Sequence, residues 1–91
     1  MKFVGRIERD GQPAIRDVTG NYEFVGEPSE HQRFAGQMSL PVGKKIAVGM
    51  MYRLVCNNDL AAMVKIVGVS PDPQEPTIAS FVGTGPFALS R

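Results

Sequence analysis

The sequence contains one histidine, His31, and one cysteine, Cys56, the side chains best suited to acid–base and nucleophilic chemistry. A serine and a glutamate directly precede His31, but a catalytic triad is defined by spatial geometry and not by adjacency within a turn. Cys56 is in phase with Tyr52 and Leu54 in an extended segment, which predicts a small hydrophobic core residue and not an activated thiol. We therefore interpret His31 as a solvated turn residue and Cys56 as part of the core.

Other chemical signatures in the sequence are incomplete. One cysteine and one histidine cannot supply the tetrahedral ligand set of a zinc site. The segment Gly83-Thr84-Gly85 lacks the third glycine and the following helix of a phosphate-binding loop, and it predicts a strand-ending turn. The carboxylate pairs Glu23 with Glu27 and Asp72 with Glu75 fall on solvent-facing or loop positions, where raised pKa values are not expected. We expect no catalytic residue, no metal and no cofactor, and hence a protein that is not an enzyme.

Positive charge is concentrated between residues 37 and 70, where four basic residues accompany a single acidic one. Small β-barrels bind single-stranded nucleic acid with a basic groove and aromatic stacking platforms. Here the aromatic residues are five Phe and two Tyr, mostly in phase with the predicted core, and the net charge of +1 gives no long-range field. Nucleic-acid binding is therefore an alternative and not the favoured function. Its candidate anion contacts are Lys44, Lys45, Arg53 and Lys65.

A second set of residues is apolar and lies opposite the predicted core. The segment Leu60–Val69 is apolar on both faces and is interrupted only by Lys65. Either a second sheet covers the additional apolar face, or the face mediates self-association, for which methionine side chains are well suited. Because dimerisation commonly completes the core of a small chain, we expect a homodimer or a protein partner. The predicted self-association residues are Met51, Val55, Met63, Val67 and Val69.

These residues are positioned by a chain in which glycine and proline recur about every eight to twelve residues, with alternating segments between them. Asp10-Gly11 predicts a hairpin turn, and the clearest alternation runs from Phe34 to Leu40. Leu60–Lys65 would also suit a helix, but the β-branched residues that follow favour a strand. We predict an all-β fold: a small antiparallel meander of about seven strands closing into a barrel or a flattened sandwich, with at most one short helical turn near 28–32.

The 91 residues, 43% of them hydrophobic, predict a single small β domain over 1–91 with one continuous core. The lone cysteine favours a reducing compartment, and the sequence contains no signal peptide and no apolar run of about 20 residues. We therefore expect a cytoplasmic location and no membrane contact.

The sequence as a whole predicts a non-enzymatic binding or assembly module that acts through protein or self-contact, such as an accessory or adaptor protein of a bacterium, phage or mobile element. Two alternatives stay open, a nucleic-acid-binding barrel and a barrel that holds a small ligand or an enzymatic site. A cavity lined by polar groups around Tyr22, His31 or Cys56 would favour the last. No motif indicates a particular family.

Overall fold

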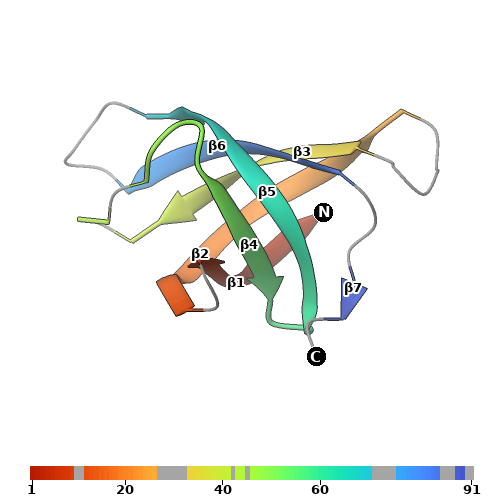
Figure 1. Ribbon diagram of the computed structural model, residues 1–91, viewed down its shortest axis with the longest axis horizontal. Coiled ribbons are helices and arrows are strands. Elements are labelled where there is room, and N and C mark those ends of the chain that lie inside the picture. The colour runs from red at the N-terminus through yellow and green to blue at the C-terminus, as the bar shows by residue number, and fades with distance from the viewer. Residues whose placement is uncertain are drawn as a thin grey trace.

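The computed structural model describes residues 1–9, 12–26, 33–41, 43–44, 46–70, 76–84 and 88–89. The described residues contain no helix, and the predicted helical turn near 28–32 and the Asp10-Gly11 turn lie outside them. The all-β prediction is confirmed (Figure 1). The strands are β1 (Lys2–Arg9), β2 (Gln12–Val25), β3 (Arg33–Leu40), β4 (Met51–Cys56), β5 (Leu60–Val69), β6 (Thr77–Thr84) and β7 (Ala88–Leu89).

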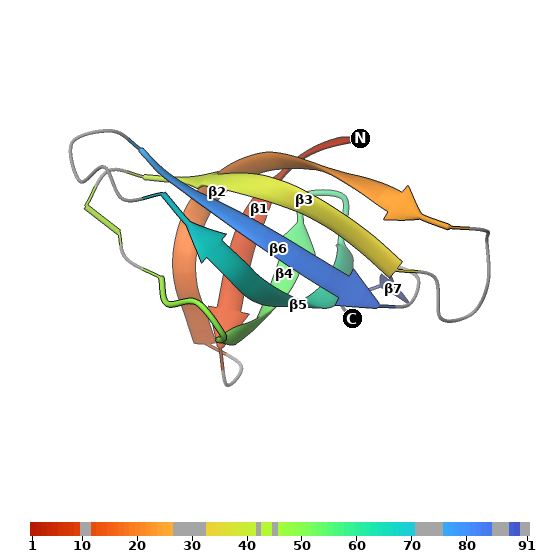
Figure 2. The ribbon, with the colours of Figure 1, turned by 90° about the horizontal axis from the view of Figure 1, so that it is seen from above.

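Six of the strands close into an antiparallel barrel, as the sequence predicted. Their order is β4-β1-β2-β3-β6-β5, and β5 pairs back to β4. Two meanders, β1-β2-β3 and β4-β5-β6, make up the wall (Figure 2). The connection from residue 41 to residue 50 brings β4 beside β1, which gives the Greek-key order of four antiparallel strands. The two-residue strand β7 pairs with the first residues of β5.

The barrel interior is filled by large apolar side chains from all six strands. The alternation of β3 buries Phe34, Met38 and Leu40, and that of β4 buries the face that carries Cys56. Four aromatic rings contact one another inside, with centroid distances of 6.0 to 6.4 Å. These rings belong to Phe3, Tyr22, Phe34 and Phe81. The core therefore forms within a single chain and needs no second copy to complete it.

Two irregularities explain where simple alternation fails. In β2, Ile15 and Val18 are both buried although they are three positions apart, because the strand bulges at Asp17, which has a φ of 59°. In β5 the register against β6 shifts between Ile66 and Gly68, and the following Val69 packs against the core. The prediction that Val69 faces outward is therefore wrong.

Candidate functional site

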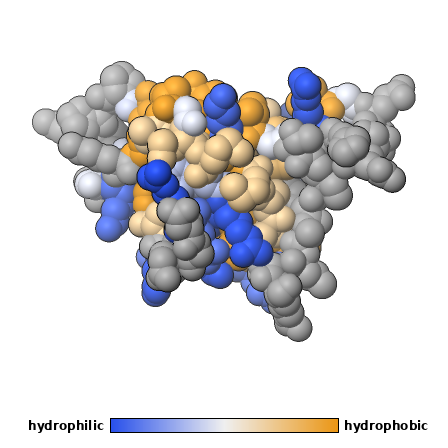
Figure 3. Space-filling view, viewed as in Figure 1, coloured by the Kyte–Doolittle hydropathy of each residue, from blue (hydrophilic) through white to orange (hydrophobic). Residues whose placement is uncertain are grey.

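Large apolar side chains gather on the outside of β4, β5 and β6, in the region where the sequence predicted self-association. Figure 3 shows hydrophobic residues over these strands with hydrophilic residues among them. Each of four side chains is 40 to 50% exposed, which is unusual for neighbouring positions of one sheet. We define the outer apolar face as these four residues: Met51, Met63, Val67 and Val82.

The outer apolar face differs from the predicted set at three positions. Val55 is only 1% exposed, because it is enclosed between its register neighbours Arg6 on β1 and Ala61 on β5, so its assignment to an exposed surface is wrong. Val69 is excluded by the bulge in β5. Val82 was missed, although it alternates with the buried Phe81 and this pattern could have revealed it.

Two shallow grooves flank Val82 on this surface. One, of about 280 Å³, is lined by Met51, Met63 and Lys65 from β4 and β5, with Val82 and Gly83 from β6. The other, of about 380 Å³, lies towards β2 and β3 and is lined by Val25, Arg33, Phe34, Ala35, Val82 and Gly83. Val82 therefore forms a ridge between two depressions, a shape that can interlock with a complementary protein surface.

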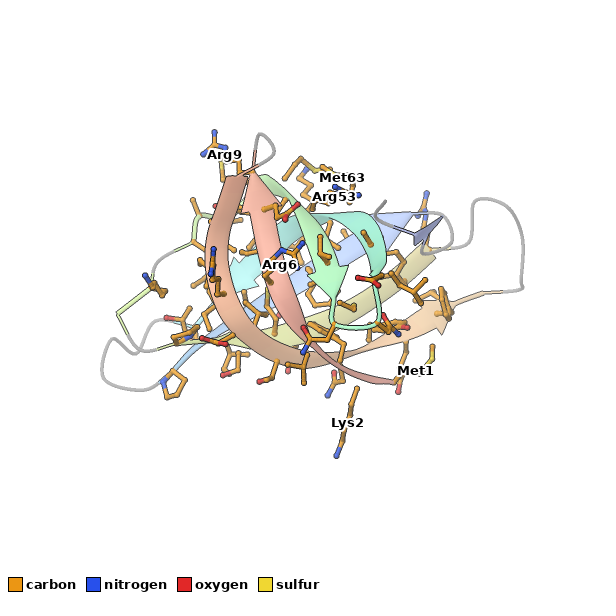
Figure 4. All side chains as sticks on the ribbon, turned by 90° about the horizontal axis from the view of Figure 1, so that it is seen from below. Met1, Lys2, Arg6, Arg9, Arg53 and Met63 are labelled. Atoms are coloured by element: carbon orange, nitrogen blue, oxygen red, sulfur yellow. The ribbon has the colours of Figure 1, made fainter. Side chains whose placement is uncertain are left out.

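The four predicted anion contacts do not all come together. Arg53 and Lys65 share the outer face as diagonal neighbours, because Arg53 pairs with Met63 (Figure 4) and Lys65 pairs with Met51 two positions along the strands. Lys44 is placed at the other end of β6, where its carbonyl accepts a hydrogen bond from the Thr77 hydroxyl at 3.3 Å. Lys65 pairs with Val82, which lies five positions after Thr77 on β6. At 3.3 Å per residue, Thr77 and Val82 are about 16 Å apart, and so Lys44 and Lys65 lie near opposite ends of the strand. Lys45 lies outside the described residues.

Arg53 instead belongs to an ion-pair cluster around Glu8. The Glu8 side chain is 11% exposed, and its carboxylate lies 2.8 Å from Nε of Arg6 and 3.7 Å from a terminal nitrogen of Arg53. Two guanidinium groups on half-exposed side chains thus share one largely buried carboxylate, and their charge compensates its desolvation. The cluster joins β1 to β4 at the closure of the barrel.

A pocket of about 340 Å³ opens at the end of the barrel where β1 begins and β4 ends. Burial raises the pKa of the Cys56 thiol. The pKa of Tyr22 is also raised, mainly by burial and to a smaller extent by the nearby Cys56. Both groups are therefore neutral at neutral pH, so the site offers a phenol hydroxyl and a weakly hydrogen-bonding thiol instead of a nucleophile. The pocket is lined by Lys2, Phe3, Val4, Tyr22, Cys56, Asn57, Asn58 and Leu60.

Within the part of the chain that the structure describes, no three His, Cys, Asp or Glu side chains are grouped to hold a metal ion. That part also contains no helix long and apolar enough to cross a membrane. His31 lies outside it, so its predicted role as a turn residue stays a prediction.

No family model, curated protein or solved structure matches the chain. Function must therefore be argued from the outer apolar face and the pocket.

Proposed function

We propose that this chain is a non-enzymatic assembly module that acts through protein contact, with a second copy of the chain as its partner. The observation that carries the proposal is the outer apolar face, whose four side chains stay about half exposed although the barrel already has a complete core. Large exposed apolar side chains gathered on one side of a small protein are typical of an interaction site. The ridge at Val82 and the grooves beside it add a shape that a partner can match.

The energetics favour a partner that brings apolar surface of its own. Complete burial of a large apolar side chain contributes about 1.5 to 3 kcal/mol, so covering the exposed half of one contributes about 1 kcal/mol. Association costs about 4 to 15 kcal/mol in lost freedom of motion. Burial of the four half-exposed side chains of one copy offsets only the lower end of that cost. In a dimer the second copy buries its own four side chains as well, which doubles the stabilisation. A symmetric dimer is also the commonest way in which a small domain uses such a surface.

The test is the mass of the protein in solution across a wide concentration range. We expect sedimentation equilibrium to give a mass above that of the 9.9 kDa monomer, and Val82→Asp to raise the dissociation constant about tenfold or more. Val4→Asp is the matched control, because Val4 is 50% exposed on the outside of β1, away from the outer apolar face. A wild-type protein that stays monomeric up to millimolar concentration, or a Val82→Asp variant that associates as the wild type does, would contradict the proposal.

The pocket at the barrel end supports a second candidate, binding of a small ligand. Its lining includes the aromatic residues Phe3 and Tyr22, the amide residue Asn57 and the basic residue Lys2, whose side chain extends outward from the start of β1 (Figure 4). This combination suits a small apolar anion, which would place its ring against the aromatic wall and its charge beside Lys2. Nucleic-acid binding is not proposed, because Arg53 shares Glu8 with Arg6 and the lysines are dispersed.

A further inference from the structure

The ladder between β1 and β4 ends before β1 itself ends. Its last bond on this side runs from the backbone N–H of Asn57 to the carbonyl of Val4, at 2.8 Å. The chain then reverses through a turn in which the Asp59 N–H donates to the Cys56 carbonyl at 2.9 Å. β1 begins two residues before Val4, at Lys2. Within the described residues, therefore, no strand pairs with Lys2 on the side where β4 lies.

The backbone groups of Lys2 point towards this open side. The amino group of Met1 donates to the carbonyl of Tyr22 at 2.7 Å, and the Tyr22 N–H donates to the Met1 carbonyl at 2.9 Å. Such hydrogen-bonded pairs alternate with non-hydrogen-bonded ones along two antiparallel strands, so Lys2 directs its N–H and carbonyl away from β2. Val4, two positions later, directs its carbonyl the same way and bonds to the β4 side. Lys2 thus presents one donor and one acceptor at an open strand edge.

The pocket at the barrel end lies on the same side of β1. Lys2 and Val4 contribute to its lining from β1, and Asn57 contributes from the turn after β4. Phe3 faces the barrel interior, where its ring centroid is 6.2 Å from that of Tyr22. The side chain of Lys2 points outward instead (Figure 4). An open backbone edge, a cavity with aromatic residues in its lining and a cation therefore occur together.

We infer that this end of the barrel binds a short extended segment of another protein, which adds to β1 beside Lys2 as an antiparallel strand. Strand addition gives affinity through main-chain hydrogen bonds and specificity through alternate side chains. The residue that pairs with Lys2 places its side chain outside, next to the lysine, so an acidic residue fits there. Its two neighbours point inward as Phe3 does, where the pocket favours apolar side chains. The favoured sequence is therefore apolar, acidic, apolar.

This inference goes beyond the proposed self-association and beyond a small ligand in the pocket. None of the four residues of the outer apolar face lines the pocket, so the two contacts use different surfaces of the barrel. A small anion needs the pocket and the charge of Lys2, whereas an extended segment also needs the backbone groups of Lys2. The test must therefore change the main chain of the bound segment and keep its side chains.

The probe is the blocked peptide acetyl-Val-Glu-Val-amide, titrated into isotope-labelled protein and followed by NMR. We expect saturable binding with the largest amide shifts at Lys2 and Asn57. N-methylation of the central glutamate removes the N–H that donates to the Lys2 carbonyl, so it should weaken binding about tenfold or more. N-methylation of the first valine is the matched control, because its N–H points away from β1, and that peptide should bind as the unmodified one does.

Exchange of charge tests the pairing beside Lys2. We expect Lys2→Glu to weaken binding of acetyl-Val-Glu-Val-amide about fivefold or more and to prefer acetyl-Val-Lys-Val-amide, because opposite charges across a strand pair attract and like charges repel. Val82→Asp, on the outer apolar face, should bind both peptides as the wild type does. Circular dichroism of the variants shows that any loss of binding does not result from unfolding.

The outcomes separate this inference from the proposed function. Equal binding of the two N-methylated peptides, or no binding of the unmodified peptide up to about 10 mM, overturns strand addition. Loss of binding in Val82→Asp but not in Lys2→Glu would place the peptide on the outer apolar face and also overturn it. A wild type that stays monomeric in solution contradicts self-association and leaves strand addition standing.

Discussion

The ring of Phe34 on β3 lies directly over Gly83, its register partner on β6. A Cβ atom at position 83 would overlap three atoms of this ring. The ring itself is completely buried, and it contacts Tyr22 and Phe81 at centroid distances of 6.0 and 6.4 Å. The glycine therefore leaves the space that the Phe34 ring occupies. A barrel of six strands has room for few such large side chains in its interior.

We expect Gly83→Ala to lower the free energy of unfolding by about 1 to 3 kcal/mol, because the added methyl group must displace a buried ring that packs against Tyr22 and Phe81. Gly68→Ala is the matched control in the neighbouring strand. The nearest atom to a Cβ at position 68 is Cβ of Ser80 at 3.7 Å, an ordinary contact, so this change should leave stability within about 0.5 kcal/mol. Urea denaturation measures both. Equal losses in the two variants would show that the overlap with Phe34 is not the cause.

The fold was predictable from sequence where one face of a strand is buried along its whole length. Phe34, Met38 and Leu40 alternate with polar residues, and this period of two fixes which side chains enter the core. The strand order was less accessible, because β4 pairs with β1 through residues about 50 positions apart, and local patterns carry no information on such pairing. The bulge at Asp17 could not be predicted either, because a single aspartate only modestly favours a positive φ.

The candidate site was predictable only in part, for a related reason. Alternation placed Met51, Met63 and Val67 on the outside correctly, because each follows the period of its own strand. It failed at Val55, whose burial depends on neighbours from two other strands. The pocket was hidden for the same reason, since Tyr22 and Cys56 meet only after the barrel has closed.

The stability of the protein should fall at alkaline pH because of Cys56 and Tyr22. Their pKa values are raised in the folded state from ordinary values of 9.0 and 10.0, so the folded protein holds these protons more tightly than the unfolded chain. The resulting stabilisation is fully present below the ordinary values and is lost as the pH rises through the folded values. Urea unfolding between pH 7 and pH 11, under reducing conditions, should show this decline.

The variants Cys56→Ala and Tyr22→Phe identify the groups responsible for that decline. Each lowers stability at neutral pH by removing a contact, but each should also flatten the alkaline part of the stability curve, because one titrating group is gone. The slope is the informative quantity, since a purely structural effect shifts the whole curve without changing its shape. A double variant whose stability declines as steeply as that of the wild type would show that other groups are responsible.

The pocket at the barrel end should bind a small apolar anion, and 8-anilinonaphthalene-1-sulfonate is a suitable probe because its fluorescence rises in an apolar site. Its rings suit the aromatic residues Phe3 and Tyr22 of the lining, and Lys2, also part of the lining, is the cation that its sulfonate would contact. We expect Lys2→Glu to weaken binding about fivefold or more, since it replaces a charge-assisted contact by repulsion. Val82→Asp, on the outer apolar face, should leave binding unchanged. The reverse result, with binding lost in Val82→Asp and kept in Lys2→Glu, would place the dye on the outer apolar face and remove the support for a ligand pocket.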